Sequence, residues 1–262
     1  MARFCTLCSS SSGNSVYIGT ASYGILIDAG ASCKKLKTSM RELGIDPGSI
    51  KAIFVTHEHT DHVSGLRVLA GSLQAPVYAT GGTLAGLNNL GCLDGKFRTE
   101  KLTAEGVAVG DMRVKFFRTS HDAKEPCGYR IELPDRTVGV ATDTGRVTDD
   151  MMKGLAGCDL VLLESNYDEE MLTMGYYPPQ LKARIRSELG HMSNDLCAET
   201  AGRLVEIGVN YLVLGHLSQH NNTPQKAYAC THAALKRMGA VENRDYELSV
   251  APVGPMERFM TF

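Results

Sequence analysis

The chain of 262 residues has an ordinary globular composition, with 43% apolar residues, 21% charged residues and a formal net charge of −2 at pH 7. This length suits one large α/β domain or two small ones, and it allows a core large enough to fold without disulfides or structural metal. The near-neutral total excludes a protein that is basic throughout, although a local basic groove can exist within a neutral total.

The N-terminal segment MARFCTLCSSSSGNS lacks the apolar region of a secretory signal, and no apolar run reaches the length of a bilayer-spanning helix. We therefore expect a cytoplasmic protein with no membrane partner. Cys5 and Cys8 form an isolated CxxC with no second pair at zinc-ribbon spacing. We expect all eight cysteines to be reduced thiols, most of them buried.

Short apolar runs rich in β-branched residues and divided by Gly, Ser and Asp turns predict many strands. In chain order, the expected strands are residues 3–8, 15–19, 23–28, 52–55, 77–79, 113–119, 128–133, 137–141, 159–163, 210–214 and 246–250. Helical periodicity predicts helices over residues 32–44, 62–73, 82–90, 147–156, 179–189, 193–208 and 223–238. Early strands arrive as hairpins and later ones alternate with helices, which favours two packed sheets with helices outside. No linker or repeat divides the chain, so we expect residues 1–262 to form one domain.

Polar residues cluster at the points where predicted strands end. The pairs are Thr56-His57, Ser120-His121, Thr142-Asp143, Glu164-Ser165 and Gly215-His216. Loops on a rigid scaffold are where functional sites usually form. Five strand ends that carry His or acidic residues therefore predict one sheet edge lined with potential ligands.

The segment HEHTDH at residues 57–62 is the most specific motif in the chain. In an extended stretch His57 and His59 point to the same side, so both can reach one ion. Asp61 and His62 then enter the helix expected from residue 62, which turns them toward a second ion. Burial of these groups without partners would be costly, and a helix needs only one cap. We therefore interpret them as metal ligands rather than as capping or core residues.

This HxHxDH motif after a strand resembles the hallmark of the metallo-β-lactamase superfamily. The resemblance implies an α/β fold of the αββα sandwich type, in which two mixed β-sheets pack face to face with helices outside. It also implies two divalent ions per chain. The first would take His57, His59, His121 and Asp143, and the second would take Asp61, His62, Asp143 and His216. These nitrogen and oxygen donors suit Zn²⁺, Mn²⁺ or Fe²⁺.

Further stretches resemble one branch of this superfamily, the YycJ (WalJ) proteins. They are SSSSGNS at 9–15, ESNYDEEML at 164–172, YYPPQLKARIRSELGHMSN at 176–194 and GHLSQHNNTP at 215–224, together with TSHDA and ATDTG. The likeness spans nearly the whole chain. It implies an intracellular metal-dependent nuclease, an exonuclease for which DNA is favoured over RNA as the nucleic acid substrate, although the sequence itself does not decide between the two. The sequence leaves open whether the chain forms a homo-oligomer.

Glu164 and His191 resemble the paired Glu and His of the neighbouring tRNA 3′-processing enzymes. A His on a loop before a helix can donate a proton if a carboxylate orients it. The alternative is that His191 merely precedes an N-cap at Ser193 or Asn194. By this resemblance the catalytic residues are His191, Glu164 and Asp61. A hydroxide that bridges the two metals would attack phosphorus, and His191 would protonate the departing oxygen.

Two polar loops have the composition of phosphate contacts. The candidates are backbone amides of residues 9–14 with the side chains of Ser12 and Asn14, and the side chains of Ser218, Asn221 and Asn222. The helix expected from residue 223 would add a favourable dipole. Ordinary turn chemistry explains the same residues equally well. His220 is a further candidate contact.

Three cations, Lys182, Arg184 and Arg186, lie on one predicted helix. They could neutralise the phosphates of a strand, although a basic helix is more often a solvated face. Two other functions stay open, because fold does not determine function. One is hydrolysis of a small substrate such as a cyclic phosphodiester, a thioester or a lactam. The other is a scaffold protein that keeps the fold but has lost catalytic activity. The complete set of predicted ligands argues against this alternative.

Overall fold

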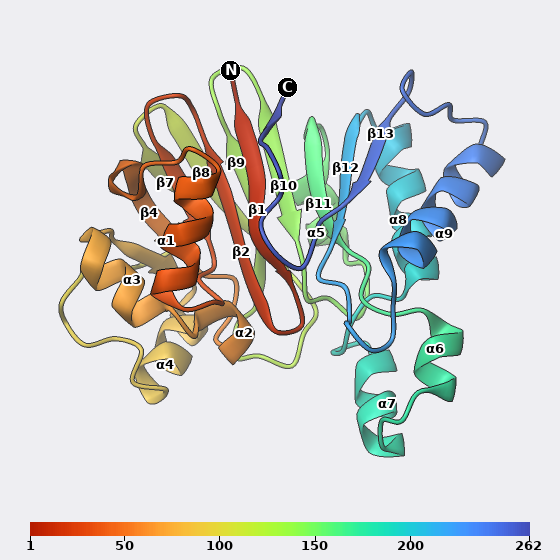
Figure 1. Ribbon diagram of the computed structural model, residues 1–262, viewed down its shortest axis with the longest axis horizontal. Coiled ribbons are helices and arrows are strands. Elements are labelled where there is room, and N and C mark those ends of the chain that lie inside the picture. Colours follow the sequence, from red (N-terminus) through yellow and green to blue (C-terminus); the bar gives the residue numbers. More distant parts are fainter.

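The computed structural model describes all residues from 1 to 262 and contains two β-sheets of seven strands each. The strand order is β14-β1-β2-β3-β4-β5-β6 in the first sheet and β13-β12-β11-β10-β9-β8-β7 in the second. The sheets face one another, with α1, α3 and α4 on the outer face of the first and α5, α8 and α9 on the outer face of the second (Figure 1). This arrangement confirms the predicted αββα sandwich.

Each sheet is mixed. The first contains β1 (Arg3–Ser10), β2 (Gly13–Gly19), β3 (Gly24–Ile27), β4 (Ile50–Phe54), β5 (Val77–Ala79), β6 (Thr99–Lys101) and β14 (Met260–Thr261). The second contains β7 (Val107–Val109), β8 (Met112–Arg118), β9 (Cys127–Glu132), β10 (Thr137–Ala141), β11 (Leu160–Glu164), β12 (Tyr211–Gly215) and β13 (Glu247–Val250). Pairing is parallel from β3 to β6 and from β10 to β13, and antiparallel elsewhere.

The helices lie close to their predicted positions. They are α1 (Cys33–Glu42), α2 (Thr60–Val63), α3 (Leu66–Leu73), α4 (Gly81–Asn89), α5 (Asp149–Leu155), α6 (Glu169–Met174), α7 (Pro179–Arg186), α8 (Asn194–Glu206) and α9 (Pro224–Arg237), with a 3-10 turn at Pro47–Ser49. None of them is long and apolar enough to cross a membrane. The short elements α6, β6, β7 and β14 have too few residues to show a periodicity, and the sequence did not predict them.

The helix predicted over residues 62–73 is in fact two helices, α2 and α3, with a break at Gly65. Gly65 packs directly on a neighbouring loop: its amide donates to the carbonyl of Ala29, and a Cβ at this position would lie 1.9 Å from the carbonyl oxygen of Ala31. Gly30 in turn packs against the carbonyl of Asp61, where a Cβ would lie only 1.7 Å away. The break therefore lets the loop after β3 pack against the HxHxDH segment.

The core forms three layers because each central strand is buried on both faces. Ile25 and Ile27 pack between the sheets, whereas Leu26 between them packs under the outer helices. The period of two in a strand places alternate residues on opposite faces, so such strands are apolar throughout. All eight cysteines are free thiols and five are buried, which confirms the prediction from composition.

Candidate metal centre

The predicted ligands meet at the carboxyl ends of the parallel strands, the end at which Figure 1 shows α2, α6 and α7. His57 follows β4, and Asp143 and His216 follow β10 and β12. Asp143 and His216 have left-handed backbones with φ of 56° and 55°, and Asp28 after β3 has φ of 63°. Such conformations are costly outside Gly and cluster at functional sites. Here they turn the chain sharply where each strand ends.

The structure brings all seven predicted ligands together. Within each of four groups, the side-chain donor atoms lie within 4.8 Å of one another. The groups are His57 with His59 and His121; His57 with His62 and Asp143; Asp61 with His62 and His216; and Asp143 with Glu164, His191 and His216. The groups share members, so they form one continuous cluster of donors.

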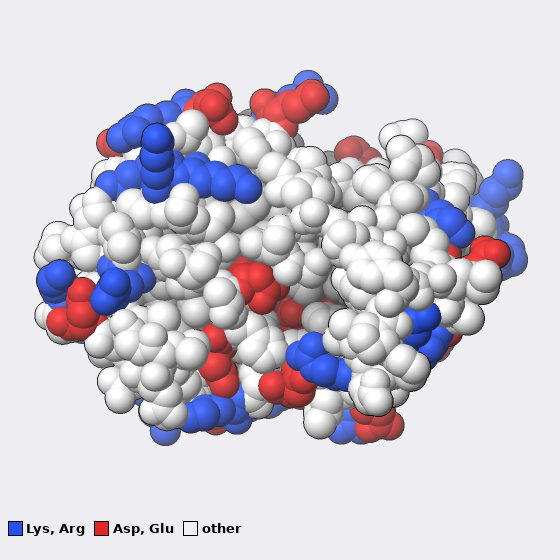
Figure 2. Space-filling view, turned by 60° about the horizontal axis from the view of Figure 1, so that its bottom comes forward, with Lys and Arg blue, Asp and Glu red and all other residues white.

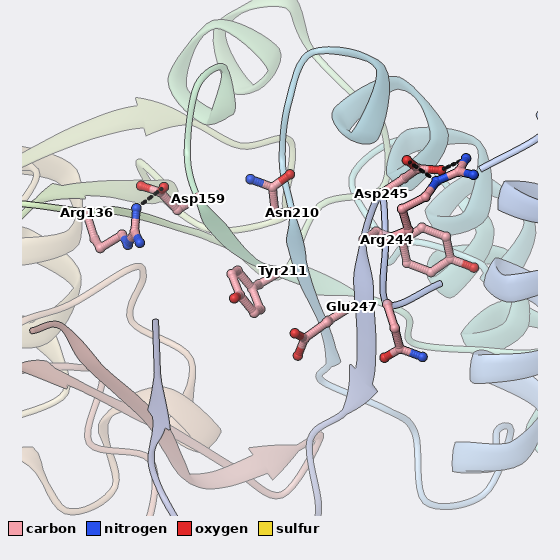
Figure 3. Close-up of a pocket in the computed structure, with 9 residues that line it drawn as sticks. Arg136, Asp159, Asn210, Tyr211, Arg244, Asp245 and Glu247 are labelled. Carbon is pink, nitrogen blue, oxygen red and sulfur yellow. Dashed lines mark hydrogen bonds and ion pairs between the residues drawn. The ribbon is translucent and has the colours of Figure 1, made fainter. Parts of the chain in front are cut away.

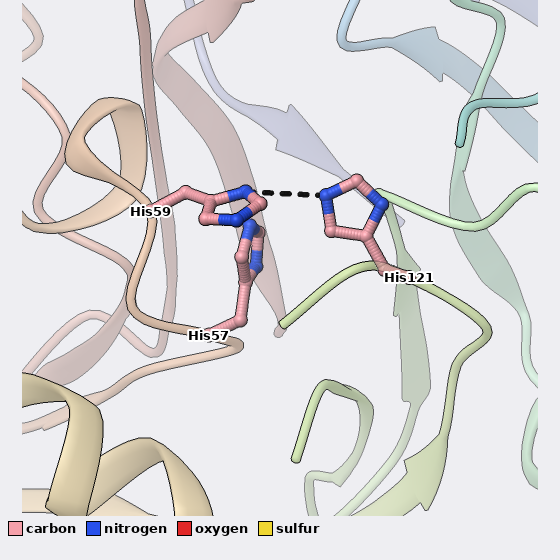
Figure 4. Close-up of side chains that lie close together, drawn as sticks. All are labelled: His57, His59 and His121. Carbon is pink, nitrogen blue, oxygen red and sulfur yellow. Dashed lines mark hydrogen bonds between the residues drawn. The ribbon is translucent and has the colours of Figure 1, made fainter. Parts of the chain in front are cut away.

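The first group consists of three imidazoles that point toward one another (Figure 4). His59 Nδ1 lies 3.2 Å from His121 Nε2, and the opposite nitrogen of His121 lies 2.9 Å from the carbonyl oxygen of Gly190. His57 Nε2 is buried and has no hydrogen-bond partner. A buried polar atom without a partner is costly, and a divalent ion between these nitrogens would satisfy it. The residues therefore fit a metal.

Asp143 lies at the middle of the cluster. Its Oδ2 is 3.2 Å from His62 Nε2, and its Oδ1 is 3.4 Å from His216 Nε2 and 3.7 Å from His121 Nε2. One carboxylate thus faces imidazoles of both predicted ligand sets.

Asp28 contacts the donor cluster and is not among the residues that the sequence predicted for the site. Its Oδ2 lies 2.7 Å from His62 Nδ1, and its carboxylate also accepts the backbone N–H and the hydroxyl of Thr56, each at 2.8 Å. A carboxylate on the outer nitrogen of a ligating His fixes its tautomer and raises its basicity. The available signal was the position of Asp28 at the end of a predicted strand, like the predicted ligands.

Nearby carboxylates raise the pKa values of these imidazoles, whereas burial lowers them. Burial opposes the charge on His216, but Asp143, Asp61 and Glu164 outweigh it and raise the pKa of His216 to about 10. His62 behaves in the same way, with its pKa well above the usual range. Burial, together with the facing His62, instead holds the pKa of His57 well below its usual range. Metal binding must displace the protons that the metal-free centre carries.

Glu164 and His191 form the expected pair, with His191 Nδ1 at 2.7 Å from Glu164 Oε1. Glu164 is fully buried, and burial would raise its pKa, but His191 and His216 outweigh this and lower it. The side chain of His191 is 15% exposed, so it reaches the solvent side of the cluster. Ser193 is the N-cap of α8, with its hydroxyl accepting from the Leu196 amide, and His191 is not needed for capping.

Of the two side chains predicted as contacts in the first polar loop, one is buried and the other is exposed. Asn14 is buried, and its Nδ2 lies 3.1 Å from His62 Nε2 and 3.3 Å from Asp61 Oδ2, within the donor cluster. Ser12 is exposed at the tip of the β1–β2 hairpin, and its hydroxyl accepts from Gln219 Nε2 at 2.8 Å. The hairpin and the loop after β12 are therefore joined at the border of the centre.

The loop after β12 holds the other predicted contacts, of which Ser218, Asn221 and Asn222 are buried and His220 is exposed. Ser218 Oγ accepts from the Asn221 amide at 3.2 Å. Asn222 Nδ2 donates to the Ser165 carbonyl and to Asn194 Oδ1, both at 2.8 Å. The structure thus uses the Asn222 side chain to hold the loop and does not direct it toward the centre.

A cavity of about 500 Å³ opens beside His59 and Asp61. Two cations line it, Lys124 and Arg184, and Arg184 also forms a bidentate pair with Asp122 at 2.6 and 2.9 Å. Figure 2 shows this face, with acidic side chains around a central hollow and basic side chains at its margins. A long substrate can therefore meet positive charge beside the donor cluster.

The other two cations of the predicted basic helix have a different role. Lys182 Nζ donates to the carbonyl of Thr173 at 2.7 Å, and Arg186 pairs with Glu169. Both bonds fasten α7 to α6. Of the three basic residues, only Arg184 lines the cavity beside the centre.

A second cavity, of about 400 Å³, lies at the opposite ends of the strands of the second sheet (Figure 3). Its charged groups are paired with each other, Arg136 with Asp159 and Arg244 with Asp245. None of the metal-donor groups lies there. The potential metal ligands therefore lie at the carboxyl ends of the strands, away from this cavity.

A two-sheet sandwich with this His and Asp cluster defines a metal-dependent hydrolase of the metallo-β-lactamase fold. Residues 23–217 match the beta-lactamase superfamily domain. The chain is 34% identical to an exodeoxyribonuclease YycJ of Bacillus anthracis, with 94% of each chain covered. It is 37% identical to an exodeoxyribonuclease WalJ of Streptococcus pneumoniae, covering 86% of this chain and 85% of that one. The chain belongs to the beta-lactamase superfamily and, within it, to the YycJ-like branch.

The fold itself matches solved structures at much lower identity. The metallo-beta-lactamase fold protein YhfI from Bacillus subtilis superposes with a TM-score of 0.72 at 17% identity, over 97% of both chains. This similarity agrees with the two-sheet architecture and extends over nearly the whole chain.

Proposed function

We propose that this protein is a dinuclear metal-dependent nuclease that acts as an exonuclease on DNA. The observation that carries the proposal is the His191–Glu164 pair at 2.7 Å, directly beside the donor cluster. The leaving group of a phosphodiester is poor and needs a proton. The negative charge on the phosphoryl oxygens also needs strong electrostatic stabilisation during attack on phosphorus. The names of the relatives at 34% and 37% identity support DNA as the substrate.

The two predicted ligand sets assign the metal sites. One ion would be held by His57, His59, His121 and Asp143, and the other by Asp61, His62, Asp143 and His216. Zn²⁺, Mn²⁺ and Fe²⁺ all fit these donors. When bound, such ions activate water for attack and stabilise the charge on the phosphoryl oxygens.

His191 supplies the proton in this proposal. With Nδ1 held by the Glu164 carboxylate, its other ring nitrogen can donate to the departing oxygen of the cleaved strand. Glu164 then stabilises the orientation of the ring and the imidazolium form before transfer. Glu164 also lies 3.1 Å from His216 Nδ1. The same carboxylate therefore contacts both the proposed general acid, His191, and a predicted metal ligand.

Substrate phosphates would meet the polar residues around the centre. Lys124 and Arg184 line the adjoining cavity. Ser12 and Ser218 lie on the two loops that border the cluster, and Asn14, at the start of β2, lies within it. Asn221 and Asn222, which are buried, would hold the second loop in place.

The decisive experiment compares substrates on the purified protein with its native metal. End-labelled single- and double-stranded DNA and RNA are offered beside bis-p-nitrophenyl phosphate, a thioester and a lactam, with Asp61→Ala as the control. We expect stepwise shortening of DNA that Asp61→Ala abolishes. Turnover of the thioester or lactam without cleavage of any nucleic acid would refute the proposal, and internal cuts would refute the exonuclease assignment.

A further inference from the structure

Three aromatic rings gather on the surface beside the centre. The ring centroids of Tyr176 and Tyr177 are 5.1 Å apart, and that of His220 lies 5.5 Å from Tyr176 and 6.0 Å from Tyr177. Tyr176 is 76% exposed, His220 is exposed and Tyr177 is half-buried. Such a cluster of exposed rings has no role in the core, and exposed apolar patches commonly mark binding sites.

The cluster borders the metal centre. His220 follows the predicted ligand His216 by four residues, so their Cα atoms can be at most about 14 Å apart. Tyr177 comes from the segment between α6 and α7, and its ring lies beside that of His220 in the loop after β12. Both segments lie at the end of the molecule where the donor cluster lies (Figure 1).

The rings stand on a rigid base. The Asp168 amide at the start of α6 donates to the carbonyl of Asn221 at 2.8 Å. Gly175 packs against the same residue, since a Cβ there would lie 2.7 Å from Asn221 Oδ1. The Asn222 side chain also holds this loop, because it donates hydrogen bonds to the Ser165 carbonyl and to Asn194 Oδ1. The backbone segments that carry the rings are therefore anchored to each other, so little backbone entropy is lost on binding.

We propose that Tyr176, flanked by Tyr177 and His220, stacks on an unpaired nucleobase of the strand whose phosphodiester lies at the metal centre. The inference rests on the proposed nuclease function and deepens it. Aromatic rings accept any base through its flat face, so such a platform favours single-stranded ends without sequence preference. Three rings match one or two bases, whereas a stable protein interface buries about 800 Å² on each partner.

The test uses oligonucleotides with the full-length metal-loaded protein. We expect Tyr176→Ala to lower the ratio of kcat/KM for single-stranded DNA to that for bis-p-nitrophenyl phosphate by about 5- to 150-fold, the usual size of one base–aromatic stack. Tyr176→Phe keeps the ring and should retain the ratio. Met174→Ala, an 81% exposed residue on the neighbouring helix, is the matched surface control.

A second measurement follows the base itself. A 2-aminopurine near the end of the strand should lose fluorescence on binding to the wild-type protein and less on binding to Tyr176→Ala. An abasic nucleotide at the same position should remove the difference in kcat/KM between the two proteins.

The outcomes separate the two proposals. If the wild-type protein cleaves no oligonucleotide, the nuclease function is refuted. If it cleaves DNA but neither Tyr176→Ala nor the abasic nucleotide changes the rate, only the stacking platform is refuted. A changed sedimentation coefficient of Tyr176→Ala with unchanged cleavage would assign the rings to an interface between copies of the chain, which also overturns the inference.

Discussion

The Asp28 carboxylate and the His62 imidazole, 34 residues apart in the sequence, meet at 2.7 Å beneath the metal centre. The same carboxylate accepts two bonds from Thr56, so its two oxygens receive three donors. Asp28 thereby orients a predicted ligand and is itself in none of the four donor groups.

Replacement of Asp28 by Asn should weaken metal binding. An amide offers one acceptor oxygen where three donors converge, and its N–H₂ would face a donor. We expect the apparent metal affinity to fall by about 10- to 100-fold, as for other residues that orient ligands. Competition with a chromophoric chelator measures this. Asp135→Asn at an exposed position is the control, and an affinity equal to wild type in Asp28→Asn would contradict the role.

Asp143→Asn tests the bridging carboxylate. Asn tolerates the left-handed backbone at this position better than Ala does, so the variant removes charge without adding backbone strain. We expect elemental analysis to find close to two ions in the wild-type chain and at least one fewer in the variant. Circular dichroism should show that the fold survives. Two retained ions in Asp143→Asn would contradict the assignment.

His191→Ala should lower turnover while metal content stays intact. The expected loss is about 100-fold or more for an oligonucleotide, the usual size of a general-acid contribution. The loss should shrink for bis-p-nitrophenyl phosphate, because p-nitrophenolate leaves without a proton. Equal losses on both substrates would indicate that His191 positions the substrate and does not donate the proton.

Glu164→Gln should affect both proton donation and metal binding, because Glu164 contacts His191 at 2.7 Å and His216 at 3.1 Å. We expect lower turnover together with weaker metal binding, in contrast to His191→Ala. Parallel kinetics and metal titration on the two variants separate the roles. A variant with full metal affinity would show that the contact with His216 carries no energetic weight.

Two lysines provide a matched test of the nucleic acid path. Lys124 lines the cavity beside the centre, whereas Lys182 bonds to the carbonyl of Thr173. Lys124→Ala should weaken DNA binding and flatten the dependence of log K on log salt by about one unit, because one fewer counterion is released. Lys182→Ala should leave the slope unchanged. A smaller slope in Lys182→Ala alone would place the DNA over α7 instead.

Local pattern accounts for much of what the sequence could predict. Short apolar runs located the central strands, because a strand buried on both faces, such as the one with Ile25, Leu26 and Ile27, is apolar throughout. The HEHTDH motif and the strand-end positions of His121, Asp143 and His216 were equally local signals. The structure brings these residues into one cluster because parallel pairing aligns the carboxyl ends of their strands.

The amino-acid sequence by itself determined the longer strands, the membership of the superfamily and the predicted ligands, because each depends on residues close together in the chain. Only the tertiary structure decided that Asp28 supports His62, that the Gly190 carbonyl orients His121, and that Lys182 fastens two helices. These contacts join residues that no short window contains. Their partners depend on which loops pack together at the strand ends, and burial makes each such pairing obligatory.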